Sequence, residues 1–203
     1  MKLIIVVTLI AIFSIVIFTS FKLMPPNRTE EQKYTVIRKE KDFEIRFYPS
    51  ATVATTNSNA KSYKDLSGSG FRTLAGYIFG GNETNTSIAM TSPVHMDIND
   101  SASSMSFVMP SSYTEENLPK PNDPKVLIHK TAEEYVAVIR FGGYASDKDL
   151  IFYSAKLKDL LNEKGITFYG NARFLGYNPP FQLIDRRNEI IVSVIWEDKN
   201  NLQ

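Results

Sequence analysis

The sequence predicts an α+β domain in which two ββαββ halves share an antiparallel sheet and two helices. Runs that alternate apolar and polar residues flank two longer stretches with helical periodicity, in the order ββαββ followed by ββαββ. Pro93 and Pro179 lie 86 positions apart, and the same offset carries Phe71 onto Leu157. An offset shared by a helix and a proline-centred turn predicts an internal duplication. Such a domain is expected to hold a ligand between its halves.

The first half contains a hairpin that continues into the run 51–56, then one helix and two further strands. The strands are 34–38, 43–48, 51–56, 88–98 and 104–109. The helix covers residues 61–79, where Leu66, Phe71, Leu74 and Ile78 fall on one face. Glycines weaken this helix, and the Gly80-Gly-Asn82 sequence ends it.

The second half begins after a proline-containing loop at residues 110–124, which we take as the seam between the halves. Its expected strands are 125–130, 134–141, 173–177 and 189–196. Its helix starts at Ser146, which has capping-box spacing to Asp149, and Gly165 is suited to follow its end.

The amino terminus carries an apolar run at residues 3–21, long enough to cross a bilayer at about 1.5 Å per residue. We predict a membrane anchor or signal segment at 1–22, a linker at 23–33, the domain at 34–197 and a polar tail at 198–203. An uncleaved anchor is favoured, because no small-x-small cleavage site follows the run. The domain is then expected on the periplasmic or extracytoplasmic side of the membrane.

The composition argues against several classes of function. The net charge is +1 without a basic stripe, so no nucleic-acid partner is expected. The chain has no cysteine and no Gly-x-Ser-x-Gly elbow, and we find no metal-ligand pair at helical spacing. We therefore expect a binding protein, with no catalytic residue and no metal site.

Two polar positions stand out within apolar strands. His95 follows Ser-Pro-Val and is expected to point away from Met96; it is a candidate axial ligand for a haem iron. Glu189 precedes an apolar run and is, with Tyr177, a candidate polar anchor for a ligand in the cleft. The alternative is that Glu189 forms a structural ion pair with Arg186 or Arg187.

Several motifs in order across residues 34–196 resemble those of the SOUL family of haem-binding proteins. They are Phe43-Glu-Ile-Arg46 with Tyr48, Phe71-Arg-Thr-Leu-Ala-Gly-Tyr-Ile-Phe-Gly-Gly-Asn82, Met90-Thr-Ser-Pro-Val94, Ser106-Phe-Val-Met-Pro110, Phe141-Gly-Gly-Tyr144, Gly176-Tyr-Asn-Pro-Pro180 and Arg186-Arg-Asn-Glu-Ile190. The resemblance implies two similar halves packed as a distorted barrel with two helices. It extends to the effector-binding domains of the gyrase-inhibitor-like group.

The resemblance also implies that haem, or a related tetrapyrrole, binds at an apolar surface beside the first helix. The residues implicated there are Phe71, Leu74, Ala75 and Ile78, with Arg72 and Lys64 as partners for the propionates. Some members carry a histidine proposed as an iron ligand where this chain has Phe47. Any axial bond would then come from His95 or be absent.

The leading hypothesis is a membrane-anchored carrier or buffer of haem or a related tetrapyrrole. A second hypothesis is a receptor for another small amphipathic molecule, held in the cleft between the halves by Glu189. A third is a hydrolase in the same cleft, in which Glu189 or Tyr177 assists a water molecule. The sequence does not set the oligomeric state.

Overall fold

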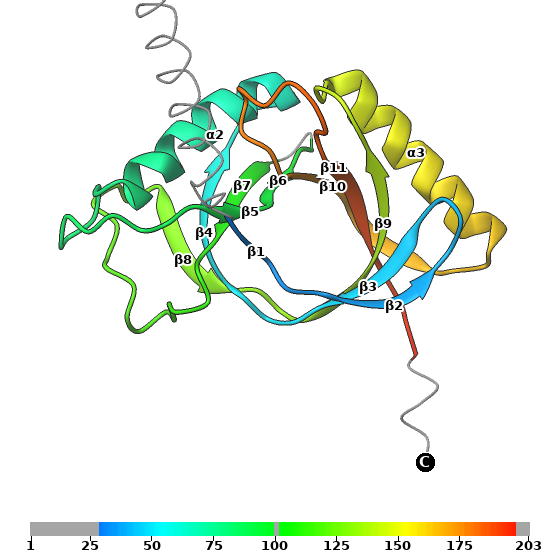
Figure 1. Cartoon of the computed structure of the whole chain (residues 1–203), viewed down its shortest axis with the longest axis horizontal. Helices are drawn as coiled ribbons and strands as arrows, with labels where there is room; N and C mark the ends of the chain where they lie inside the picture. Colours follow the sequence, from blue (N-terminus) through cyan, green and yellow to red (C-terminus); the bar gives the residue numbers. More distant parts are fainter. Residues whose placement is uncertain (1–28, 100–101, 198–203) are drawn as a thin grey trace, which may run out of the picture.

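In a computed structural model, the chain forms a nine-stranded antiparallel sheet covered on one face by two helices, which confirms the α+β class (Figure 1). The structure describes residues 29–99 and 102–197. The strand order is β2-β3-β9-β11-β10-β6-β7-β4-β8. The strands are β2 (Thr35–Lys39), β3 (Glu44–Tyr48), β4 (Thr52–Ser58), β6 (Val94–Asp97), β7 (Ser103–Val108), β8 (Val126–Lys130), β9 (Glu134–Phe141), β10 (Phe168–Gly176) and β11 (Asn188–Val194). Two further short strands, β1 (Glu30–Glu31) and β5 (Thr91–Ser92), pair in parallel.

Both helices begin at serine caps. Helix α2 (Tyr63–Ile78) starts after Ser62, whose hydroxyl accepts the backbone N–H of Asp65. Helix α3 (Asp147–Glu163) starts at the expected capping box, in which Ser146 and Asp149 bond each other's backbone N–H groups. The two helix starts are joined directly, because the Tyr63 N–H donates to Asp147 Oδ1 at 2.5 Å.

The main core lies between the sheet and the two helices. Leu66, Leu74 and Ile78 of α2 and Leu157 and Leu161 of α3 are buried in it. A smaller cluster lies on the opposite, concave face of the sheet; it consists of Tyr48, Val136, Val138, Leu175 and Ile191. Successive side chains along a strand point to opposite faces of the sheet, so the central strands contribute apolar residues to both clusters. These strands are therefore buried on both faces.

The expected barrel is wrong in one respect: the sheet is strongly curved but does not close, since β2 and β8 remain its two ends. The sheet can be divided between its neighbours β6 and β10 into two four-strand series. Outward from this point, one series is β6-β7-β4-β8 and the other is β10-β11-β9-β3. An offset of 86 positions carries α2 closely onto α3 and β7 onto β11. It does not relate the prolines, because Pro93 precedes β6 whereas Pro179 follows β10. Internal duplication stays a prediction.

The expected placement of a membrane-anchored domain outside the cytoplasmic membrane needs correction. Within residues 29–99 and 102–197, no helix has the length and apolar character required to span a bilayer. The segment proposed to do so, residues 3–21, lies outside the described residues, as do most of the expected linker and the tail at 198–203. Residues 30–32 of that linker lie against the domain.

Candidate functional site

The structure separates the sequence-predicted site residues onto the two faces of the sheet. Leu74 and Ile78 of α2 belong to the core between helices and sheet, and so does Met96 of β6. His95, next to Met96, points to the concave face, as the alternation predicts. Glu189 and Tyr177 also lie on the concave face, beside the smaller apolar cluster.

Glu189 lies at the centre of a buried polar network. Its side chain is fully buried, and its Oε2 accepts hydrogen bonds from Arg46 Nη1 at 2.8 Å and from the Tyr177 hydroxyl at 2.9 Å. Its Oε1 accepts from Arg187 Nε at 3.0 Å and Arg46 Nη2 at 3.2 Å. The structure thus brings Glu189 and Tyr177 together, and both carboxylate oxygens are already used. Arg187 was one of the two expected ion-pair partners; Arg186 instead donates to carbonyl oxygens of its own loop.

The electrostatics of this network favour its present charge state. Burial raises the pKa of Tyr177, and the neighbouring Glu189 carboxylate raises it further, so the phenol stays protonated. Burial alone would lower the pKa of Arg46, but the hydrogen bonds and charge of Glu189 outweigh this and raise it. Two guanidinium groups therefore enclose one carboxylate, which suits a structural role.

Residues 30–34, which we call the N-terminal strap, lie across the concave face (Figure 1). Gln32 donates its backbone N–H to the Ser92 carbonyl, and Glu31 forms an ion pair with Arg187 at 3.1 Å. Tyr34 covers the network, with its ring 4.2 Å from the Arg46 guanidinium carbon. The expected cleft between the halves is thus partly occupied by the chain itself.

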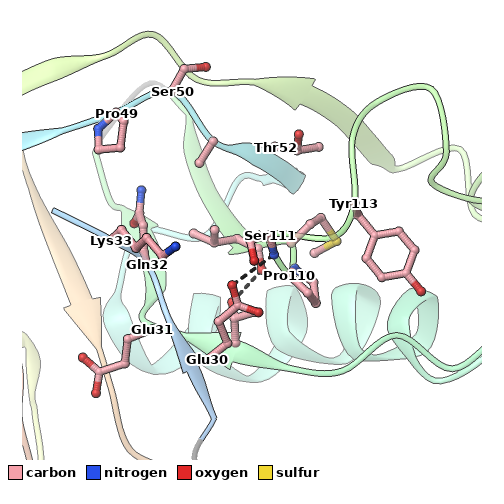
Figure 2. A pocket seen from close by; sticks show the side chains of 14 residues that line it. Glu30, Glu31, Gln32, Lys33, Pro49, Ser50, Thr52, Pro110, Ser111 and Tyr113 are labelled. Atoms are coloured by element: carbon pink, nitrogen blue, oxygen red, sulfur yellow. Dashed lines mark hydrogen bonds between the residues drawn. The ribbon is translucent and has the colours of Figure 1, made fainter.

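Residues 30–33 of the strap border a small pocket of about 240 Å³ (Figure 2). Figure 2 shows the Glu30 carboxylate directed at the backbone N–H of Ser111, which donates to it at 3.0 Å. Pro110 and Tyr113 form the wall on that side. These contacts fasten the strap to the segment that follows β7.

His95 lies in a separate polar cavity of about 260 Å³ on the concave face. Its Nε2 lies 2.7 Å from Gln32 Oε1, which places the ring proton on Nε2 as the donor. Burial and, to a smaller extent, the charge of Arg173 lower the pKa of His95 to about 4, against a smaller opposing effect of Glu134. His95 is therefore neutral at pH 7 and faces away from α2.

Helix α2 presents cations but little apolar surface. Leu74 and Ile78 are buried at 0% and 1% exposure, so neither can contact a ligand on the outer face. Phe71 is half-buried, with its ring 5.3 Å from that of Phe107, and Ala75 is also half-buried. The exposed positions are polar or small and include Lys64 and Arg72.

A larger hollow, which sequence reasoning missed, runs along α3. This α3 groove has a volume of about 770 Å³. The residues around it are Lys61, Ser62, Met96, Ile98, Asn99, Asp147, Leu150, Ile151, Ser154, Ala155, Lys158, Asn171, Ala172, Phe174 and Ile190. The signal in the sequence is that Ile151 and Ala155 lie beside the apolar stripe of the helix and widen it.

Comparison with solved structures shows the fold. The C-terminal domain of EcmrR superposes with a TM-score of 0.60 at 8% identity, covering 81% of this chain and 99% of that domain. A hydrolase from Listeria innocua superposes with a TM-score of 0.54 at 11% identity, covering 87% of this chain and 97% of the other. At such identities the likeness concerns architecture alone.

Comparison of sequences shows the family. Heme-binding protein 2 of Mus musculus is 31% identical over 156 residues, which are 73% of this chain and 76% of the relative. Heme-binding protein 1 of Xenopus laevis is 30% identical over 177 residues, 82% of this chain and 90% of the relative. The family described as SOUL heme-binding protein matches residues 29–193. This chain therefore belongs to the SOUL heme-binding protein family.

Proposed function

We propose that this protein binds haem or a related tetrapyrrole and acts as a carrier or buffer without catalysing a reaction. Membership of the SOUL heme-binding protein family carries the proposal. The family and the relatives are named for haem binding rather than for a reaction. The buried network supports the same view, because Glu189 has no oxygen left to activate a water molecule.

The exposed residues on the helical side fit such a ligand in part. Haem is a largely apolar disc with two propionates, so it needs apolar surface and cations. Lys64 and Arg72 are exposed on α2 and would pair with the propionates, while Phe71 and Ala75 offer a limited apolar edge. Leu74 and Ile78 would act only by holding the helix in place.

Axial ligation is not part of this arrangement. His95 lies on the concave face, on the other side of the sheet from α2, and its Nε2 bonds Gln32. At the position where some relatives carry a histidine, Phe47 packs against Tyr135 with the ring centroids 5.0 Å apart. A haem beside α2 would thus be held by the ring and its propionates. The chemistry of a bound haem would come from its iron, while these side chains would bind and orient the ring.

Titration of haemin into the purified full-length protein tests the proposal. We expect a shifted Soret band and saturable quenching of Trp196, which is half-buried against the main core. A flavin serves as the negative control, because it is also a large planar molecule, and it should produce no saturable quenching of Trp196. A protein that shows neither a Soret shift nor saturable quenching with haemin would overturn the proposed function.

The concave face supports a second, weaker candidate: a receptor for another small amphipathic molecule anchored by Glu189 and Tyr177. The observation in its favour is the polar cavity around His95 on the same concave face, although neither Glu189 nor Tyr177 lines that cavity. Such a ligand would have to displace existing bonds to Glu189. Loss of a non-haem ligand in Glu189→Gln, with haemin titration unchanged, would favour this candidate over the first. A broad hydrolase-substrate screen without turnover would dismiss the third hypothesis.

A further inference from the structure

Phe79, the residue that caps the end of α2, is a large aromatic side chain that is 66% exposed. Its backbone is held in place, because its N–H donates to the Ala75 carbonyl at 3.0 Å and the residue forms an isolated bridge with Ser87. Its ring belongs to neither apolar cluster of the fold. A single exposed phenylalanine needs no explanation by itself, so its neighbours on the helix decide what it can do.

Phe79 lies in line with Arg72 on the outer face of α2. Residues three, four and seven positions apart share one side of a helix, and the bond from Phe79 to Ala75 shows that helical geometry continues to Phe79. Arg72 and Gly76 are exposed, and Ala75 is half-buried. Seven residues correspond to about 10 Å along the helix axis. The end of α2 thus carries a cation and an aromatic ring, with two small residues between them.

The space above Gly76 is open, although the fold does not require a glycine there. A Cβ added at Gly76 would meet no atom within 4 Å. Gly81, in the turn beyond the helix, is different: a Cβ there would lie 2.5 Å from the Gly76 carbonyl oxygen, to which the Gly81 N–H donates. Glycine inside a helix lowers its stability relative to alanine. The helix therefore loses stability by leaving this part of its outer face flat.

The cations of this face are available to a ligand. In the part of the chain that the structure describes, neither Lys64 nor Arg72 takes part in an ion pair, whereas four other arginines do. Asp65 on the first turn is engaged in capping, where its Oδ2 accepts the Ser62 hydroxyl. Lys64 and Arg72 both precede Phe79, so the cations lie towards the start of α2 and the aromatic ring lies at its end. A planar molecule with anionic groups along one edge matches this order.

We infer that Phe79 stacks on the tetrapyrrole and fixes its orientation beside α2. The ring lies over Ala75 and Gly76, and its two carboxylates are directed towards Lys64 and Arg72. The inference rests on the proposed function and adds the residue that orients the ligand. Aromatic rings attract each other in offset or edge-on arrangements. Phe79 supplies the large apolar side chain that the exposed positions within α2 lack.

Truncation of the aromatic side chain tests the stacking contact. We expect Phe79→Ala to raise the Kd for haemin about tenfold, which corresponds to about 1.4 kcal/mol. Phe79→Tyr keeps an aromatic ring and should change the Kd less than about twofold. Phe152→Ala is the matched control, because Phe152 is 60% exposed but lies on α3, and it should leave the Kd unchanged. Equal losses in Phe79→Ala and Phe79→Tyr would contradict stacking.

A filling substitution tests where the ring lies. Gly76→Leu places a side chain in the open space between Arg72 and Phe79 and should raise the Kd for haemin at least tenfold. Gly68→Leu adds the same side chain at an equally open position nearer the start of α2 and should change the Kd less than about threefold. Leucine favours a helix more than glycine does, so neither variant should lower the urea midpoint. A loss of affinity would therefore come from the binding site rather than from the fold.

Charge reversal tests the direction of the carboxylates. Arg72→Glu should raise the Kd for haemin about tenfold, whereas Lys156→Glu changes net charge equally at an exposed position of α3 and should have little effect. Haemin dimethyl ester keeps the ring but masks both carboxylates. Its Kd should respond to Phe79→Ala but not to Arg72→Glu. An ester that responds equally to both changes would contradict the pairing of Arg72 with a carboxylate.

The outcomes separate the inference from the proposed function. If the wild-type protein does not bind haemin, the proposed function and this inference both fail. If it binds haemin and neither Phe79→Ala nor Gly76→Leu weakens binding, the ring does not lie at the end of α2, while the proposed function stands. Weakening by Gly68→Leu alone would place the ring on the first turns of α2 and would likewise overturn the inference. Circular dichroism verifies that each variant is folded.

Discussion

The guanidinium of Arg46 on β3 lies 2.8 Å from the carboxylate of Glu189 on β11, although β9 runs between these two strands. The two side chains are 5% and 0% exposed. Because each residue reaches over an intervening strand, the pair ties together three strands on the concave face. A buried pair of this kind is costly to break from one side.

Removal of one partner should therefore destabilise the fold strongly. Glu189→Gln leaves Arg46 and Arg187 without their shared carboxylate, and we expect the free energy of unfolding to fall by about 3–5 kcal/mol. Arg46→Met combined with Glu189→Met should cost less than the two single changes added together. Urea denaturation monitored at Trp196 measures these values.

The exposed ion pair between Arg38 and Glu40 is the matched control for this prediction. Arg38→Met should lower the free energy of unfolding by less than about 1 kcal/mol, because solvent screens a surface pair. If Glu189→Gln were as mild as Arg38→Met, the network would not stabilise the fold.

His95 should make stability depend on pH. Its pKa in the folded state is lowered to about 4, below the ordinary value of 6.5, so the unfolded chain binds more protons between these values. The stability contributed by neutral His95 is complete above pH 6.5 and is lost as the pH falls towards 4. The loss cannot exceed about 1.4 kcal/mol per pH unit for one proton.

Comparison of the wild type with His95→Gln separates the titration of His95 from the effects of the charged groups around it. These groups are Glu134, Asp97 and Arg173. The free energy of unfolding should fall more steeply for the wild type than for the variant between pH 6.5 and 4. Parallel curves would show that His95 titrates normally in the folded protein.

Two glycines in α2 can be replaced with a gain in stability. A Cβ added at Gly68 or Gly76 would meet no atom within 4 Å, and both positions lie inside the helix. Gly→Ala at each should raise the free energy of unfolding by about 0.5–1 kcal/mol, because alanine loses less backbone entropy. Thermal unfolding should show an increase of a few degrees, about 2–4 °C per kcal/mol.

Gly70 provides the contrast on the same helix. A Cβ there would lie 3.1 Å from Cβ of Met105 on β7, so Gly70→Ala requires Met105 or the helix to shift by a few tenths of an ångström. We expect no gain at this position. An equal gain at Gly70 and Gly76 would mean that helix propensity alone decides the result.

Asn82 fixes the turn that follows α2. It is fully buried, and its Nδ2 donates to the carbonyls of Tyr77 and Thr86 at 3.1 and 2.8 Å. Asn82→Asp replaces these donors with a carboxylate oxygen facing two carbonyls and should destabilise the fold by about 3 kcal/mol. Asn85→Asp is exposed in the same turn and should be neutral. Urea midpoints of the two variants compare them directly.

Local features of this fold could be predicted from the sequence because their causes lie within a few residues. The capping box at Ser146 and Asp149 depends on spacing alone, and the direction of His95 follows from strand alternation next to Met96. The position of α2 likewise follows from its apolar stripe and its glycine-rich end.

The site depends on contacts that no local pattern encodes. Arg46 and Glu189 are separated by 143 positions and by one intervening strand, so the partner of Glu189 could not be chosen from its neighbours in sequence. The shared offset of Pro93 and Pro179 was misleading for a similar reason. It holds for a helix and a strand, yet the two prolines lie at different points of the topology.

The N-terminal strap also determines how the molecule would respond to force. Tension applied at residue 29 is carried first by Glu30 and the two-residue pairing of β1 with β5, then by Gln32 and Tyr34. These contacts lie in series, so they would rupture one at a time by peeling. The nine-stranded sheet would bear load only after the strap had been pulled off the concave face. A stretching experiment should therefore show a weak early event, before the main rupture.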